Sequence, residues 1–86
     1  MDINLWTDNE LDYCVSLLPN WRKINFQEQE NLIMQMLESN KLLHSPEEIR
    51  LRFNYLDKLT NNEFSTYQLL TIPASDKRFI GICKKE

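Results

Sequence analysis

Three reciprocal capping boxes constrain the fold of this chain more than any other feature of its sequence. Each box pairs a Thr, Asn or Ser with a Glu three residues later: Thr7 with Glu10, Asn25 with Glu28, and Ser45 with Glu48. The first side chain of such a box accepts a hydrogen bond from an amide of the first helical turn, and the Glu accepts one from the capping residue. Each box therefore marks the start of a helix. With the apolar spacing that follows, the boxes predict helices over about 7–18, 26–40 and 46–59.

The first helix is expected to end before Pro19. Leu11 and Leu18 lie at helical spacing, but a proline disfavours the helical conformation in the residue before it and lacks the N–H that would continue the ladder. Residues 20–24 then form a connection that carries Trp21. A large aromatic side chain in a short connection usually fills the edge of a core.

The third predicted helix has apolar side chains on two flanks. Ile49, Phe53 and Leu56 form one flank, and Leu51, Tyr55 and Leu59 form the other. A helix that is apolar on two sides is normally covered on two sides. We therefore expect this helix to lie in the middle of the core.

The periodicity of the chain changes from 3.6 to 2 after residue 62. Two segments rich in β-branched and aromatic residues, 66–72 and 78–84, are separated by a turn-forming stretch, Pro-Ala-Ser-Asp-Lys. This pattern predicts a C-terminal β-hairpin. Because an isolated hairpin is barely stable in water, it should pack against the third helix. Residues 1–86 are thus expected to form a single, mainly α domain with a small β part.

The composition argues against catalysis, metal binding and membrane insertion. Cys14, Cys83 and His44 are the only soft ligands, fewer than a zinc site needs. His44 is expected to be a surface residue or a turn former and Cys14 a buried, inert thiol, and no carboxylates are paired for acid–base work. No segment has the length and apolarity of a membrane span, and the N-terminus lacks the features of a signal peptide. We therefore expect an intracellular protein that is not an enzyme and has no cofactor or small-molecule substrate.

DNA binding is one alternative that the residues support. Three helices followed by a hairpin is the order of a winged helix, whose third helix enters the major groove. The residues that would face DNA are Arg50, Asn54 and Lys58 on the third helix and Lys77 and Arg78 at the hairpin tip. Against this, the net charge is −3, and Glu47 and Asp57 share the same helix face, where they can neutralise the cations.

Protein binding is the other main alternative. Trp21 and Tyr67 are aromatic residues on predicted connections or edges, and such residues are frequent anchors of protein interfaces. An acidic chain without catalytic residues is typical of an interaction module, and it also fits a small inhibitor protein that binds a host enzyme.

Two family resemblances sharpen these expectations. The residues LWTDNELDYCVSLL, NWRKI and HSPEEIRLRFNYL resemble the Myb/SANT plan, in which Trp6, Trp21 and Phe53 would be the three aromatic core positions. The chain departs from that plan in a short first interval, a long second helix and the absence of a basic surface. The resemblance implies a three-helix bundle of the Myb/SANT or winged-helix kind, followed here by the predicted hairpin.

A closer resemblance covers residues 6–79. It is to the MRG-binding-protein family, non-catalytic subunits of histone acetyltransferase complexes, and it rests on the following residues in order: Trp6-Thr7, Asn25-Phe26, Ile49 with Phe53, Tyr55 and Asp57, Leu59 with Glu63, and Pro73 with Phe79. The family implies a nuclear protein-interaction module of a chromatin or transcription complex. The alternative is a winged-helix DNA-binding transcription regulator, phage- or plasmid-encoded and then cytoplasmic. A third alternative is a small acidic inhibitor protein that binds a host enzyme.

Overall fold

All three predicted capping boxes are present in the structure. A computed structural model describes residues 6–39 and 41–82. The long helices are α1 (Asp8–Lys23), α2 (Phe26–Glu38) and α3 (Pro46–Thr60). Thr7, Asn25 and Ser45 each accept a hydrogen bond from the amide three residues on, and each partner Glu binds back to the capping amide. The mainly α prediction is therefore confirmed, together with the starts of these helices.

Helix α1 continues through Pro19, contrary to the prediction that it ends at residue 18. The reason is the buried side of the helix, where Leu11, Cys14, Leu18 and Trp21 follow one another at intervals of three and four residues. Trp21 is 3% exposed and stacks on Phe53 with ring centroids 4.2 Å apart. An interior proline costs about 3 kcal/mol, and burying a tryptophan contributes a stabilisation of about the same size. Trp21 is thus a core residue on a helix rather than part of a connection.

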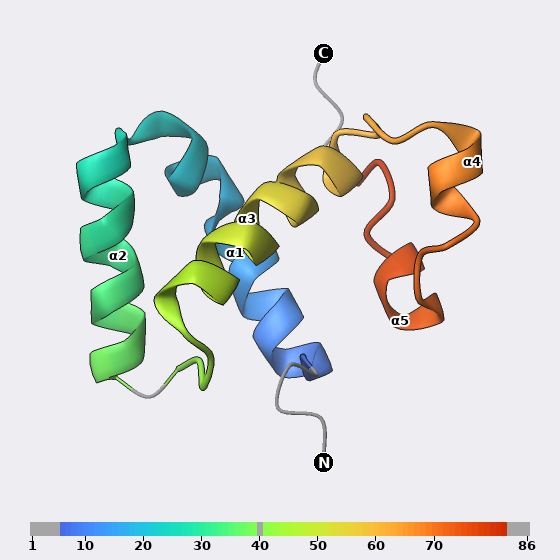
Figure 1. Ribbon diagram of the computed structural model, residues 1–86. Helices are drawn as coiled ribbons and strands as arrows, with labels where there is room; N and C mark the ends of the chain where they lie inside the picture. Colours follow the sequence, from blue (N-terminus) through green and yellow to red (C-terminus); the bar gives the residue numbers. More distant parts are fainter. Residues whose placement is uncertain (1–5, 40, 83–86) are drawn as a thin grey trace.

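Helix α3 lies against both other long helices (Figure 1). The shared core consists of Leu11, Cys14, Leu18, Trp21, Ile33, Met36, Leu42, Ile49, Phe53, Leu56, Leu59, Ile72 and Phe79. One predicted flank of α3 is fully buried, but the other is split, because Leu59 is buried, Tyr55 is half-buried and Leu51 is 67% exposed. The expectation that both flanks are covered is wrong for Leu51, which lies on the same stripe as the exposed residues Glu47, Asn54 and Lys58.

A Schellman motif ends α3. The amide of Glu63 donates to the Lys58 carbonyl at 2.9 Å, and the amide of Asn62 donates to the Leu59 carbonyl at 3.1 Å. Asn62 has a φ of 60°, the left-handed conformation that this motif requires. The Gly81 amide also reaches the Leu59 carbonyl, at 3.0 Å. The chain therefore turns back so that its last described residues lie at the end of α3.

The predicted β-hairpin is wrong over the described residues. The segment from residue 63 to residue 82, called here the C-terminal segment, contains two short helices, α4 (Thr66–Leu69) and α5 (Ala74–Lys77), and no strand. Ser65 and Gln68 form a fourth capping box, a local signal for a helical turn that outweighs the β-branched composition. The last two residues of the second predicted strand, 83 and 84, lie outside the described residues. Figure 1 shows the segment on the side of α3 that faces away from α2.

Candidate functional site

The arginines of the chain join its elements to one another. Arg22 on α1 donates to the Asp57 carboxylate of α3, to the Thr60 hydroxyl at 3.1 Å and to the Asn61 side chain at 3.3 Å. These acceptors lie in the last turn of α3 or at its cap. The contacts therefore bind the end of α1 to the end of α3.

Arg50 joins α3 to α2. Its guanidinium donates to the Glu30 carboxylate at 2.6 Å and to the Gln29 side chain at 2.7 Å. It also lies 3.9 Å from the centroid of the Phe26 ring. Arg50 is thus directed at α2 and is satisfied there, away from the exposed stripe of α3 that carries Asn54 and Lys58.

Arg78 joins the C-terminal segment to α1. It donates to the Asp12 carboxylate at 2.6 Å, and its ion pair with Asp8 measures 3.6 Å. The guanidinium also lies 4.0 Å from the centroid of the Phe79 ring. Since both acids belong to the outer face of α1, this residue fastens the segment to the helical body.

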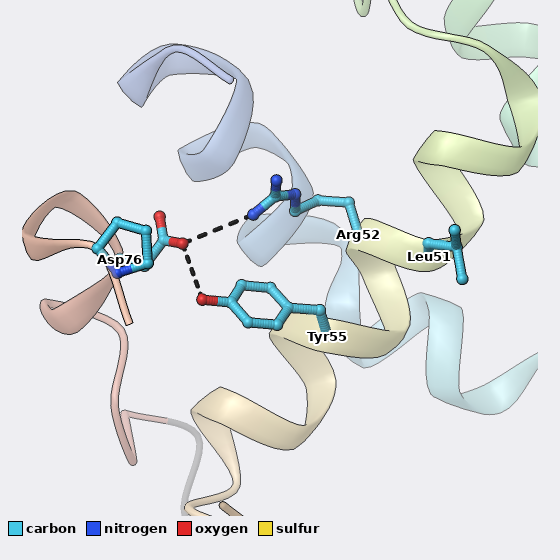
Figure 2. Close-up of a pocket in the computed structure, with 5 residues that line it drawn as sticks. Leu51, Arg52, Tyr55 and Asp76 are labelled. Atoms are coloured by element: carbon cyan, nitrogen blue, oxygen red, sulfur yellow. Dashed lines mark hydrogen bonds and ion pairs between the residues drawn. The ribbon is translucent and has the colours of Figure 1, made fainter. Parts of the chain in front are cut away.

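Arg52 and Tyr55 of α3 meet the buried carboxylate of Asp76 (Figure 2). The Tyr55 hydroxyl donates to Asp76 Oδ2 at 2.8 Å, and Arg52 Nη1 lies 3.6 Å from the same oxygen. Asp76 is 4% exposed, so its charge requires such partners. Burial, followed by the hydrogen bond to Asp76, raises the pKa of Tyr55 and keeps its hydroxyl protonated as the donor.

An open hollow of about 370 Å³ lies beside this cluster. Its lining residues are Leu51, Arg52, Tyr55, Pro73 and Asp76. In Figure 2, Arg52 and Tyr55 reach from α3 toward Asp76, and Leu51 lies further round the helix. The hollow is therefore formed between α3 and the C-terminal segment.

A second hollow of about 230 Å³ adjoins the first. Its lining residues are Tyr55, Phe64, Gln68, Thr71 and Ile72. Tyr55 lines both hollows, and its ring centroid lies 5.8 Å from that of Phe64. We call the two hollows together the α3 groove. It has largely apolar walls, and its two charged residues, Arg52 and Asp76, are paired with each other.

The residues predicted to contact a partner do not form one surface in the fold. Asn54 and Lys58 are exposed on α3, Lys77 is exposed on α5, and Tyr67 is 80% exposed on α4. Arg50 and Arg78 form the internal contacts described above, and Trp21 is in the core. Within the described part of the chain, the Lys and Arg side chains that form ion pairs are all arginines, and none of these pairs uses a lysine.

The groove itself was missed by sequence reasoning. The sequence pattern predicts Asp76 in a turn, whereas its carboxylate is the centre of the contact between α3 and the C-terminal segment. A usable signal was the pair Arg52 and Tyr55, three residues apart on one helix flank. No local pattern connects that pair with an acid more than twenty positions away.

His44 lies at a bend before α3 but is buried, so the expectation of a surface residue is wrong. It stacks on Trp6 with ring centroids 3.9 Å apart, and its Nε2 lies 3.1 Å from Glu10 Oε2. Burial alone would raise the pKa of Glu10, but hydrogen bonds from Thr7, His44 and Leu43 outweigh it and lower that pKa. This cluster joins the start of α1 to the connection before α3.

The described residues contain no arrangement typical of a metal site or an activated nucleophile. No group of three or more metal-binding side chains occurs among them. Burial, with a smaller contribution from Glu10, raises the pKa of Cys14 to about 12. The thiolate that a nucleophilic cysteine needs is therefore not populated at neutral pH. Across residues 6–39 and 41–82, the helices fall short of the length and apolarity needed to cross a bilayer.

No protein-family model, curated protein sequence or solved structure matches this chain.

Proposed function

We propose that this chain is a non-catalytic protein-interaction module that binds its partner through the α3 groove. The observation that carries the proposal is that the arginines of the chain are paired with carboxylates inside the domain. Arg50, Arg52 and Arg78 are each held by a carboxylate within the domain, as is Arg22. Arginine side chains that are already paired with acids contribute little to a surface for phosphate groups.

The surface that is left available suits a protein. Leu51 at the groove rim, Tyr67 on α4 and Leu70 directly after it are 67%, 80% and 74% exposed. Large apolar side chains beside a groove are typical of interaction sites. The charges of Arg52 and Asp76 neutralise each other within the groove. A neutral apolar segment of a partner therefore fits the groove better than an ion or a phosphate group does.

The cellular setting of the proposal rests on the resemblance to the MRG-binding-protein family. We place the module in a nuclear chromatin or transcription complex, since that family consists of non-catalytic subunits of such assemblies. The acidic balance of the chain, with a net charge of −3, agrees with a role that does not require contact with DNA.

Two parallel measurements test the function. In a gel-shift assay with random-sequence duplex, the full chain should give no shift at sub-micromolar protein. In crosslinking within native host cells, followed by mass spectrometry, one protein should be captured by the wild type and by Leu43→Asp but lost with Leu51→Asp. Leu43 is the matched control because it is 77% exposed and does not line the groove.

Salt-sensitive binding to the duplex that is abolished by Asn54→Ala with Lys58→Ala would overturn the proposal in favour of a DNA-binding regulator. These two side chains are exposed on α3 and take no part in the internal ion pairs of the described chain. The double substitution should leave the fold intact, which circular dichroism would verify.

A further inference from the structure

We infer that an exposed stripe of α3 binds the same stripe of a second copy of this chain, with the two helices antiparallel. The stripe consists of Glu47, Leu51, Asn54 and Lys58, all of them exposed. In this pairing, Glu47 of each copy lies opposite Lys58 of the other copy, and Leu51 lies opposite Asn54. The inference goes beyond the proposed function, because the occupant is the chain itself and only Leu51 of the stripe also lines the α3 groove.

The four side chains of the stripe are aligned along the helix. They follow one another at intervals of four, three and four residues, which at 3.6 residues per turn places them within about 60° of one another around the helix axis. This spacing is that of the contact positions in a pair of coiled helices. The stripe therefore offers a contact line of about three helical turns to another helix.

The stripe lies on a broad side of the molecule. The chain spans 37 × 36 × 18 Å, and Figure 1 shows α3 crossing in front of α1, with α2 on one side and the C-terminal segment on the other. The buried residues Ile49, Phe53 and Leu56 are directed at the core. At 3.6 residues per turn, the stripe is on the opposite side of α3 from them. It therefore faces outward, where a second copy has access to it.

Two charges of α3 have no ion-pair partner in the described part of the chain. Of the six charged residues of this helix, one belongs to the capping box and three form ion pairs with other elements. The other two are Glu47 and Lys58, at the two ends of the stripe. Charged side chains on one helix meet when they are three or four positions apart, whereas these are eleven positions apart. A partner for either charge therefore has to come from outside the described residues.

A second copy supplies both partners at once. Glu47 and Lys58 are equally far from the middle of the stripe, which falls between positions 52 and 53. A two-fold axis at that point turns the stripe onto itself and brings each acid opposite a base. Such self-complementarity is what a two-fold dimer needs. Antiparallel helices also place the positive end of each helix dipole beside the negative end of the other.

Other arrangements of two α3 helices pair the charges less well. A parallel pair places Glu47 beside Glu47 and Lys58 beside Lys58, and like charges repel. An antiparallel pair shifted by seven residues places one charge of each helix opposite Leu51 or Asn54 and leaves the other charge unpaired. In the inferred register, the two Leu51 side chains are three positions apart along the axis, about 4.5 Å, and contact each other. This register therefore pairs every charge of the two stripes and buries the exposed leucine.

Other classes of occupant match the stripe less well than a second copy does. A nucleic acid would meet Glu47 as well as Lys58, and the acid repels phosphate groups. An apolar segment of another protein would remove both charges from water without pairing them, which is costly. The occupant needs a base, an acid and an apolar group at matching positions in the reverse direction, and α3 itself carries this set.

The self-association is expected to be weak. Four side chains on each helix are far fewer than the roughly 20–30 residues that each partner contributes to a standard interface. Exposed ion pairs also contribute little individually. The fraction of dimer should therefore rise over protein concentrations from about 10 μM to about 1 mM.

Sedimentation equilibrium of the full chain over this range, with reversal of the two charges, tests the inference. Glu47→Lys alone and Lys58→Glu alone create like-charge pairs at both ends of the contact and should each raise the Kd by about tenfold or more. An equimolar mixture of the two variants restores both ion pairs between unlike chains and should associate as tightly as the wild type. Glu38→Lys is the matched control, because this exposed acid lies on α2 and its reversal changes the net charge equally.

Crosslinking of the wild type with a carbodiimide, which joins a carboxylate directly to an amine, reports the pairing without any substitution. Within one chain, Glu47 and Lys58 are about 16 Å apart along the helix at 1.5 Å per residue, too far for a direct link. In a mixture of unlabelled and isotope-labelled chains, mass spectrometry should therefore find a Glu47–Lys58 link between the two kinds of chain.

Three outcomes overturn the inference. The first is a wild type that stays monomeric up to about 1 mM. The second is association that either single reversal leaves unchanged, or that Glu38→Lys weakens as much, because the contact then involves another surface or only the net charge. The third is a mixture of the reversed variants that does not associate, or a dimer without the Glu47–Lys58 link. Neither residue lines the α3 groove, so these outcomes leave the proposed function to its own tests.

Discussion

The body formed by α1, α2 and α3 and the C-terminal segment are held by different forces. Among the described residues, ten of the thirteen buried apolar side chains belong to these three helices, while the segment contributes two, Ile72 and Phe79. Phe64, Leu69 and Ile80 of the segment pack against this core but are only partly buried. The other attachments of the segment are polar: Asp76 to Tyr55 and Arg52, Arg78 to Asp12, and the Gly81 amide to the end of α3. Apolar burial is summed over many contacts, whereas polar contacts depend on individual groups. Substitutions that remove side-chain volume should therefore destabilise the body most. Substitutions that remove a single polar atom should instead weaken the attachment of the segment.

The largest expected effect tests the body. Trp21→Ala removes the ring that stacks on Phe53 and leaves a cavity where the helix continues past Pro19. We expect the free energy of unfolding to fall by about 3–5 kcal/mol, measured by urea denaturation followed by circular dichroism. Tyr67→Ala is the control, because an 80% exposed side chain should change stability by less than about 0.5 kcal/mol. Equal effects of the two substitutions would contradict the packing described for α1 and α3.

An intermediate effect tests the attachment of the segment. Tyr55→Phe removes one hydroxyl and leaves the buried Asp76 carboxylate without its 2.8 Å donor. A buried acceptor that loses its partner costs about 1–3 kcal/mol. Native-state amide hydrogen exchange should therefore become faster in the segment while α1 and α2 keep the protection of the wild type. Equal acceleration throughout the chain would show that the two regions unfold as one unit.

A smaller effect concerns acid and the start of α1. The lowered pKa of Glu10 means that its carboxylate contributes stability above the usual value of 4.5 and that this contribution is lost as the pH falls through the lower folded value. The unfolding free energy of the wild type should thus decrease as the pH falls below 4.5. In Glu10→Gln the decrease should be shallower, as measured by urea denaturation at a series of pH values. If the unfolding free energy fell equally steeply with pH in the two proteins, the Glu10 carboxylate and its contact with His44 would not contribute to the stability of the body.

The smallest expected effect lies where the body meets the segment. Asn62 has a φ of 60°, and glycine adopts this conformation without the cost that other residues incur. Asn62→Gly should be neutral or stabilise the fold by up to about 1 kcal/mol, seen as a higher Tm. Asn54→Gly, in the exposed middle of α3, should lower the Tm because glycine is a poor helix former. A decrease in both variants would show that the Asn62 side chain has a role beyond its backbone conformation.

The sequence by itself determined the features that depend on neighbours three or four residues apart. The capping boxes at Thr7, Asn25 and Ser45 predicted where the long helices begin, because both partners of each box lie within one turn. The buried face of α3 followed from its periodicity in the same way. The box at Ser65 is equally local, and it specifies a helical turn where the β-branched composition predicts a strand, so the hairpin prediction is wrong there.

Only the tertiary structure decided the features that depend on distant partners. Pro19 stays inside α1 because Trp21 finds Phe53 on another helix. Arg50 forms an ion pair with Glu30 of α2, and Arg78 forms one with Asp12 of α1. Two candidate contact residues therefore make contacts within the domain instead. The α3 groove exists because Asp76 meets Tyr55 across 21 positions of sequence. A local pattern states what a side chain can bind, but long-range packing selects which partner it meets, since buried charges and aromatic rings are satisfied by whatever the fold brings within reach.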